Sequence, residues 1–227
     1  MAEDLAPRAN AAPDEIAIAK AHAVYTPFML SIYDLLVHGL SNHLAWRCPT
    51  RRITDLYRAN LSANHLEAGV GTGYFLDRTG DERLSRLFLL DINRHCLERA
   101  GRRLARFKPA LHEVNLFAPI KLNVAPFASV GLTYVLHCLP GSMSEKLKAV
   151  DHLRPLMEKG AVLFGATILG RGIAPNRAAR SLLDLYNAKG VFNNREDDIA
   201  SLREGLRQRF DEVEIKEEGC VALFCAT

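Results

Sequence analysis

The stretch EAGVGTG at residues 67–73 constrains the fold of this chain more than any other feature of the sequence. Three glycines, Gly69, Gly71 and Gly73, occupy alternate positions directly after a short apolar run that carries Glu67. A strand that turns sharply into a helix needs a residue that tolerates unusual dihedral angles, and Gly69 supplies one. A side chain at Gly71 would push away anything that approaches the loop backbone. The pattern therefore predicts a strand, a tight glycine loop and a helix, with a ligand lying against the loop.

Strand-length and helix-length apolar patterns alternate after the loop. Strands are predicted at 64–69, at 87–91, at 110–115, within 129–139 and at 161–169. The segments FDEVEIKEE and GCVALFCA, which close the sequence, predict two strands joined by a tight turn, a β-hairpin. Alternating strands and helices favour an α/β fold with a mostly parallel, doubly wound sheet that is covered on both faces. Ligands of such sheets bind beyond the carboxyl ends of the strands, where the glycine loop lies.

No strand pattern precedes residue 60. Residues 15–37 carry apolar side chains at helical spacing, and Pro49-Thr50 is a start signal for a further helix. We therefore expect a tail and a helical cap at 1–60 and a ligand-binding domain at 61–227. Two more helices are predicted after the fifth strand, as a helical insertion at about 170–207.

Composition and charge exclude several classes of protein. The formal net charge of +3 is too small to imply a polyanionic partner. No run approaches the roughly 18 to 20 apolar residues that a membrane span needs, and the polar, acidic first residues lack the features of a signal peptide. The five cysteines are scattered, odd in number and form no CxxC pair, so we expect free thiols and no metal site. A cytoplasmic location is predicted.

Asp91 follows the loop by about twenty residues, at the end of the second predicted strand. In nucleotide-binding sheets a carboxylate at this place accepts hydrogen bonds from the two ribose hydroxyls. The alternative is that Asp91 only caps the helix that follows. The glycine spacing, GxGxG, differs from the GxGxxG of dinucleotide sites and leaves less room for a pyrophosphate. An NAD-dependent oxidoreductase, whose Tyr-x-x-x-Lys proton donor we do not find, is therefore disfavoured.

With these features the chain resembles the class I S-adenosylmethionine-dependent methyltransferases, in their small-molecule (natural-product) branch. The resemblance rests on E-x-G-x-G-x-G after the first strand, the acidic end of the second, the Leu-His pair after the fourth and the terminal hairpin. It covers roughly residues 60–227. It implies a seven-stranded Rossmann-like sheet with an antiparallel last strand, S-adenosylmethionine as the cofactor and S-adenosylhomocysteine as its product.

The resemblance also implies a set of cofactor-binding residues. Glu67 would face the amino group of the methionine part, Asp91 would hold the ribose hydroxyls, and Ile92 would pack on the adenine. Asn115 and Leu116 stand where an Asp-apolar pair commonly meets the adenine edge, and the asparagine is a departure from that pattern. The glycines would pass close to the methionyl part and the ribose: Gly69, Gly71 and Gly73.

A small organic molecule is favoured as the methyl acceptor. The segment TYVLHCLPG after the fourth strand lacks the N-P-P-Y-like tetrad of enzymes that methylate adenine or glutamine amino groups. The basic run at 99–108 is more typical of a solvated helix face than of an RNA-binding stripe, so nucleic acid is disfavoured as a partner. An RNA-modifying methyltransferase is the alternative. The sequence does not choose among a hydroxyl, an amine and an activated carbon as the acceptor atom.

His137 lies just beyond the fourth predicted strand, at the rim where the sulfonium would point, and is the candidate catalytic base. As a base it would make activity rise with pH through about 6.5; an orienting or a structural role is the alternative. Tyr134 is expected to line the cofactor pocket or the core. Aromatic residues can stabilise a sulfonium, although an aromatic stripe on a helix is more often core. The candidates for binding the acceptor are Tyr25, Tyr33, Trp46, Tyr186 and Asn187.

Overall fold

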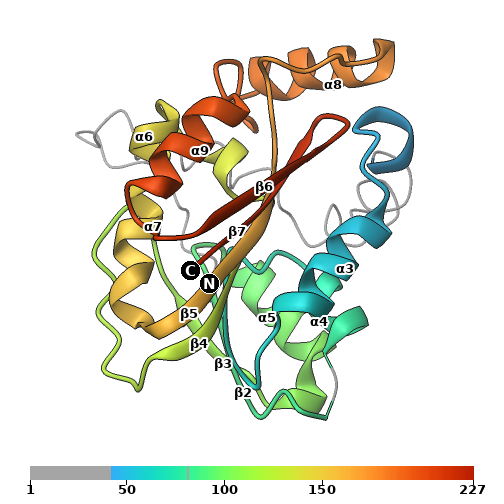
Figure 1. The fold of residues 1–227 in the computed structure, drawn as a ribbon. Helices are drawn as coiled ribbons and strands as arrows, with labels where there is room; N and C mark the ends of the chain where they lie inside the picture. Colours follow the sequence, from blue (N-terminus) through green and yellow to red (C-terminus); the bar gives the residue numbers. More distant parts are fainter. Residues whose placement is uncertain (1–41, 81) are drawn as a thin grey trace, which may run out of the picture.

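The computed structural model of the protein describes residues 42–80 and 82–227 (Figure 1). The helices predicted within 15–37, with Tyr25 and Tyr33, lie outside these residues. The helix start predicted at Pro49-Thr50 is confirmed, because α3 covers Thr50–Asn60 and Pro49 is its N-cap residue. Among the described residues, none of the helices combines the length and the apolar character needed to cross a membrane.

The seven strands form one sheet in the order β3-β2-β1-β4-β5-β7-β6. The first five pair in parallel, whereas β7 runs antiparallel to both β5 and β6. The predicted doubly wound sheet with a carboxyl-terminal hairpin is therefore confirmed. The strand bounds are β1 Asn64–Ala68, β2 Arg86–Asp91, β3 Ala110–Glu113, β4 Phe127–Thr133, β5 Met157–Ile168, β6 Val213–Glu218 and β7 Val221–Ala226.

Helices cover both faces of the sheet (Figure 1). On one face lie α3, α4 (Tyr74–Thr79) and α5 (Arg94–Arg103), and on the other lie α6 (Met143–Lys146), α7 (Lys148–Leu153) and α9 (Ile199–Arg207). The helix α8 (Arg177–Ala188) follows β5, and the predicted insertion at about 170–207 thus contains α8 and α9. The described residues also contain a π-helical turn at 42–45 and three short 3₁₀ segments: η2 Ala105–Phe107, η3 Leu136–Cys138 and η4 Arg154–Leu156.

Polar side chains fix the starts of several helices. Asn93 caps α5 by accepting a hydrogen bond from the His95 amide, and Ser142 forms a capping box with Glu145 at the start of α6. Two short helices, α6 and α7, follow Ser142 and are joined at Leu147.

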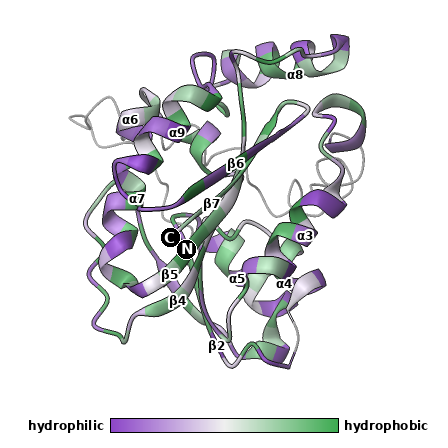
Figure 2. Ribbon diagram, viewed as in Figure 1, coloured by the Kyte–Doolittle hydropathy of each residue, from purple (hydrophilic) through white to green (hydrophobic). Residues whose placement is uncertain are grey.

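Each face of the sheet has its own hydrophobic core. The core under α3, α4 and α5 includes Ile53, Leu89 and Phe164, and the core under α6, α7 and α9 includes Leu132 and Val150. Residues 42–60, the described part of the predicted cap, pack into the first of these cores. The edge strand β6 is largely hydrophilic (Figure 2), as its sequence VEIKEE requires of a strand with one solvated face.

Candidate cofactor site

A pocket opens at the carboxyl ends of β1, β2 and β4. It is lined by the end of β1, the glycine loop, the end of β2, the segment 114–117 after β3 and, after β4, residues 133–135, 138 and 139. All eight residues that the sequence analysis assigned to the cofactor lie in this lining: Glu67, Gly69, Gly71, Gly73, Asp91, Ile92, Asn115 and Leu116. The structure thus brings residues from three separate segments to one place, although their individual roles stay predictions.

Two glycines of the loop are required by its geometry. Gly69 has a φ of 70°, and a side chain there would collide with Val135 at the end of β4. Gly71 has a φ of 54°, and a Cβ at this position would meet no atom within 4 Å. Since Gly71 also lines the pocket, its bare backbone borders open space that a ligand can approach closely.

The amide groups of the loop are largely used within the protein. The amides of Gly69 and Val70 donate to the Leu90 carbonyl at 2.7 and 3.3 Å, and that of Gly71 donates to Asp91 Oδ2 at 3.1 Å. The following helix, α4, has only six residues. The loop therefore offers a ligand a close approach to its backbone more than a set of free amide donors.

Asp91 is almost completely buried at the floor of the pocket. In addition to the Gly71 amide, its carboxylate accepts a hydrogen bond from the Asn93 amide at 2.9 Å. Burial raises the pKa of Asp91 to about 6, although these backbone hydrogen bonds oppose the shift. Asn93, and not Asp91, is the N-cap of α5, so capping does not explain why a carboxylate stands here.

Glu67 is also buried and reaches the pocket from β1. Its Oε1 accepts a hydrogen bond from the Tyr57 hydroxyl at 2.6 Å, and its Oε2 lies 2.9 Å from His65 Nε2. Tyr57 lines the pocket as well. A helix was predicted to start at Pro49-Thr50, but no sequence signal showed that its buried face, with Tyr57, reaches the ligand.

Tyr134 lines the pocket on the side of β4, which is one of the two positions expected for it, the pocket or the core. Its φ of 61° is uncommon for a residue with a side chain. The ring stands edge-on to Phe75, with 6.2 Å between the centroids, and its hydroxyl donates to Asn42 Oδ1 at 2.9 Å. Cys138 and Leu139, which the sequence analysis did not assign, continue this wall.

His137 does not occupy the rim. Its side chain is 3% exposed, and it is not among the described residues that line the pocket. Nδ1 accepts a hydrogen bond from the Ile168 amide at 3.3 Å, and the ring stands edge-on to Phe192 at 4.5 Å. Burial, with a smaller effect of the Lys146 charge, lowers the pKa of His137 to about 3. The predicted rim position is wrong, because the backbone turns into η3 after β4 and carries the ring into the core.

The variant His137→Gln should therefore lose stability and not catalysis. Loss of a buried hydrogen bond and of ring packing costs about 1–3 kcal/mol, or several degrees of melting temperature for a chain of this size. A histidine with a pKa near 3 stays neutral at physiological pH, so the pH–rate profiles of the two proteins should coincide. Turnover measured per folded molecule against pH is the test. A fall of a hundredfold or more at unchanged melting temperature would restore His137 to the mechanism.

The described residues proposed to bind the acceptor do not line the pocket either. Trp46 is 1% exposed and packs against Phe192, with 6.1 Å between the ring centroids. Asn187 exchanges hydrogen bonds with Asn194, and Tyr186 packs on Phe192 at 4.9 Å. Trp46 and Tyr186 thus contribute to packing around Phe192, and Asn187 holds the segment after α8 in place.

Comparison with known proteins finds relatives that are named O-methyltransferases. No family model matches the chain. Demethylluteothin O-methyltransferase of Streptomyces thioluteus is 36% identical over 210 residues, which cover 92% of this chain and 91% of the relative. The physcion biosynthesis cluster O-methyltransferase of Aspergillus chevalieri is 33% identical over 206 residues, covering 90% and 93%. The solved complex of DhpI with SAH superposes with a TM-score of 0.67 over 93% of this chain and 97% of that chain; at 15% identity, this likeness concerns the fold alone.

Proposed function

Because this chain belongs to the class I S-adenosylmethionine-dependent methyltransferases and acts on a small organic acceptor, we propose that it methylates a hydroxyl oxygen of a natural product. One observation carries the choice of oxygen over nitrogen or carbon. Two relatives that are at least 33% identical over at least 90% of this chain are both named O-methyltransferases.

The pocket fits S-adenosylmethionine in three respects. A Cβ at Gly71 would project into open space, so a ligand can lie against the loop. Asp91 and Glu67 place two buried carboxylates in the same lining, and a nucleoside that carries an amino acid offers them ribose hydroxyls and an ammonium group. The third feature is the mainly apolar lining between and around these carboxylates. The cofactor supplies an electrophilic methyl group on a sulfonium.

We assign roles on this basis. Asp91 accepts hydrogen bonds from the ribose hydroxyls, and Glu67 accepts a hydrogen bond from the ammonium group of the methionine part. Ile92 packs on the adenine, while Asn115 and Leu116 meet its edge. The loop backbone follows the methionyl part and the ribose at Gly69, Gly71 and Gly73.

The acceptor enters, in this proposal, from the side of the segment after β4. Tyr134, Cys138 and Leu139 form a mostly apolar wall there, which excludes water from the transfer. The left-handed backbone of Tyr134 and its hydrogen bond to Asn42 hold the ring in place. We keep the division into a cap at 1–60 and a catalytic domain at 61–227, and we propose that the enzyme works in the cytoplasm.

The test is an assay with S-adenosylmethionine that carries an isotopically labelled methyl group. Demethylluteothin, simple phenols, amines and carbon acids are offered as separate acceptors, and mass spectrometry locates the label. We expect label on oxygen, together with a rise in melting temperature on adding S-adenosylhomocysteine and none on adding NAD. Label on nitrogen or carbon alone would contradict O-methylation, whereas stabilisation by NAD alone would contradict the cofactor roles.

A further inference from the structure

A line of buried hydrogen bonds runs behind the cofactor pocket. It starts at the Tyr57 hydroxyl, which donates to Glu67 Oε1 at 2.6 Å, and continues from Glu67 Oε2 to His65 Nε2 at 2.9 Å. His65 Nδ1 lies 2.8 Å from Ser129 Oγ on the neighbouring strand β4. Tyr57 is 1% exposed, Glu67 3%, and His65 and Ser129 are fully buried. We call these four residues the Glu67 network.

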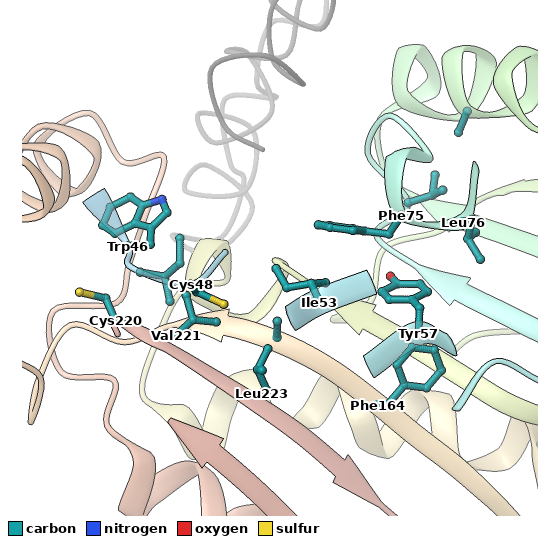
Figure 3. Packing of buried hydrophobic residues seen from close by; sticks show 14 of the residues in the cluster. Trp46, Cys48, Ile53, Tyr57, Phe75, Leu76, Phe164, Cys220, Val221 and Leu223 are labelled. Atoms are coloured by element: carbon teal, nitrogen blue, oxygen red, sulfur yellow. The ribbon is translucent and has the colours of Figure 1, made fainter. Parts of the chain in front are cut away.

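Aromatic packing fixes the two donors. The Tyr57 ring lies between Phe75, at a centroid distance of 5.5 Å, and Phe164, at 4.9 Å (Figure 3). The His65 ring also stacks on Phe164, with 5.7 Å between the ring centroids. Neither ring can turn without displacing core side chains, so the directions of both hydrogen bonds are set by the fold.

The backbone of the neighbouring strand makes room for the carboxylate. Gly131 on β4 lies opposite Glu67, and a Cβ there would collide with the Glu67 carboxylate. A buried carboxylate is costly unless donors satisfy it, and Tyr57 and His65 provide one donor to each oxygen. Each carboxylate oxygen can accept a second hydrogen bond, so capacity remains toward the pocket that Glu67 lines.

We propose that Tyr57 and His65 are positioning residues for the amino group of S-adenosylmethionine. They hold Glu67 in the orientation in which its remaining acceptor sites meet the ammonium. The inference rests on the proposed role of Glu67 in cofactor binding. It also gives the segment before β1 a role in the cofactor site, because Tyr57 comes from α3.

The test compares two ligands that differ in the amino acid part, whose amino group Glu67 is proposed to meet. S-Adenosylhomocysteine carries the amino acid, whereas 5′-methylthioadenosine has the same nucleoside without it. Tyr57→Phe keeps the ring in its aromatic packing and removes only the hydroxyl. We expect its affinity for S-adenosylhomocysteine to fall roughly tenfold, as for the loss of a hydrogen bond to a charged group, and its affinity for 5′-methylthioadenosine to stay unchanged. Calorimetry measures both.

Three further variants separate positioning from stability. Thr54→Val removes a hydroxyl from the same helix, one that donates to the Arg51 carbonyl and does not line the pocket; both affinities should stay as in the wild type. His65→Leu should repeat the selective loss, and His65→Gln, which can still donate, should restore part of it. Equal losses for both ligands, or an unchanged affinity for S-adenosylhomocysteine in Tyr57→Phe, would overturn the positioning role.

The wild type itself tests the premise. If it binds both ligands equally, Glu67 does not hold the amino group, and the proposed role of Glu67 fails together with that of its neighbours. If it prefers S-adenosylhomocysteine and Tyr57→Phe keeps the same preference, only the positioning role fails.

Discussion

Asp91→Ala should weaken the binding of S-adenosylhomocysteine by about a hundredfold or more. Two ribose hydroxyls would donate to this carboxylate, and each hydrogen bond to a charged acceptor contributes about 1.5 to 3 kcal/mol. The variant should still fold, because Asn93 and not Asp91 caps α5. Titration calorimetry on both proteins, with melting curves as the control for folding, measures the effect. An unchanged dissociation constant would mean that Asp91 only holds the amides of Gly71 and Asn93.

The raised pKa of Asp91, about 6, gives this result a pH dependence. The ionised carboxylate is the better acceptor, so the affinity of the wild type for S-adenosylhomocysteine should fall as the pH drops through 6. The neighbouring thiol of Cys96 does not titrate there, because burial raises its pKa far above neutral. Without ligand, the native state binds the proton more tightly than the unfolded chain, so the contribution of Asp91 to stability should be lost as the pH rises from about 4 through 6. Asp91→Asn should lose both dependences.

Local sequence patterns were sufficient for the fold. Apolar residues at every second position mark the buried side of a strand, and a spacing of about 3.6 residues marks the buried side of a helix. The alternation of strands and helices then restricts the sheet to a few arrangements. The cofactor residues were implied by the resemblance to the methyltransferase family, and the sheet topology explains why they lie together. Parallel strands end at one edge of the sheet, so residues just after β1, β2 and β3 must meet there. Gly71, Asp91 and Asn115 are in the same pocket for this reason.

The acceptor side could not be predicted in this way. A residue just beyond a strand can point to the pocket or into the core, and the direction depends on the turn that follows. The left-handed backbone of Tyr134 and the 3₁₀ turn η3 send Tyr134 to the pocket and His137 into the core, and neither feature leaves a mark in the sequence. Tyr57 was recognisable as an inward-facing residue, but its contact with Glu67 depends on how α3 packs against the sheet.

A buried ion pair between α6 and the segment after α8 could not be predicted from the sequence either. Lys146 Nζ donates to both carboxylate oxygens of Asp197, at 2.7 and 2.6 Å, and to the Asn193 carbonyl at 2.7 Å. Both charged side chains are at most 2% exposed. Burial lowers the pKa of Lys146 and raises that of Asp197 in spite of their mutual attraction, so each charge depends on the other.

Lys146→Met should therefore destabilise the protein by about 3 to 5 kcal/mol, because it leaves the Asp197 carboxylate buried without its cation. The melting temperature should fall on the order of 10 °C. The double variant Lys146→Met, Asp197→Leu removes both charges and should recover most of this loss, since replacing a buried pair by apolar residues is often nearly neutral. Denaturant unfolding of the two single variants and the double variant forms the cycle that measures the coupling. Losses below 1 kcal/mol in both single variants would show that water reaches the pair.

The same pair should also govern the wall beside the cofactor pocket. Asn193, whose carbonyl accepts from Lys146, donates through its amide to the His137 carbonyl at 2.8 Å, in the segment that follows β4 and also carries Tyr134. Hydrogen exchange of the amides at 190–198 should therefore accelerate in Lys146→Met more than exchange in the strands. The double variant leaves no unpaired charge in the core, but it does not restore the hydrogen bond to the Asn193 carbonyl. If the ion pair acts only through overall stability, exchange in 190–198 should recover in the double variant together with the melting temperature. If Lys146 also anchors Asn193, as the 2.7 Å contact predicts, exchange should stay fast after stability has returned.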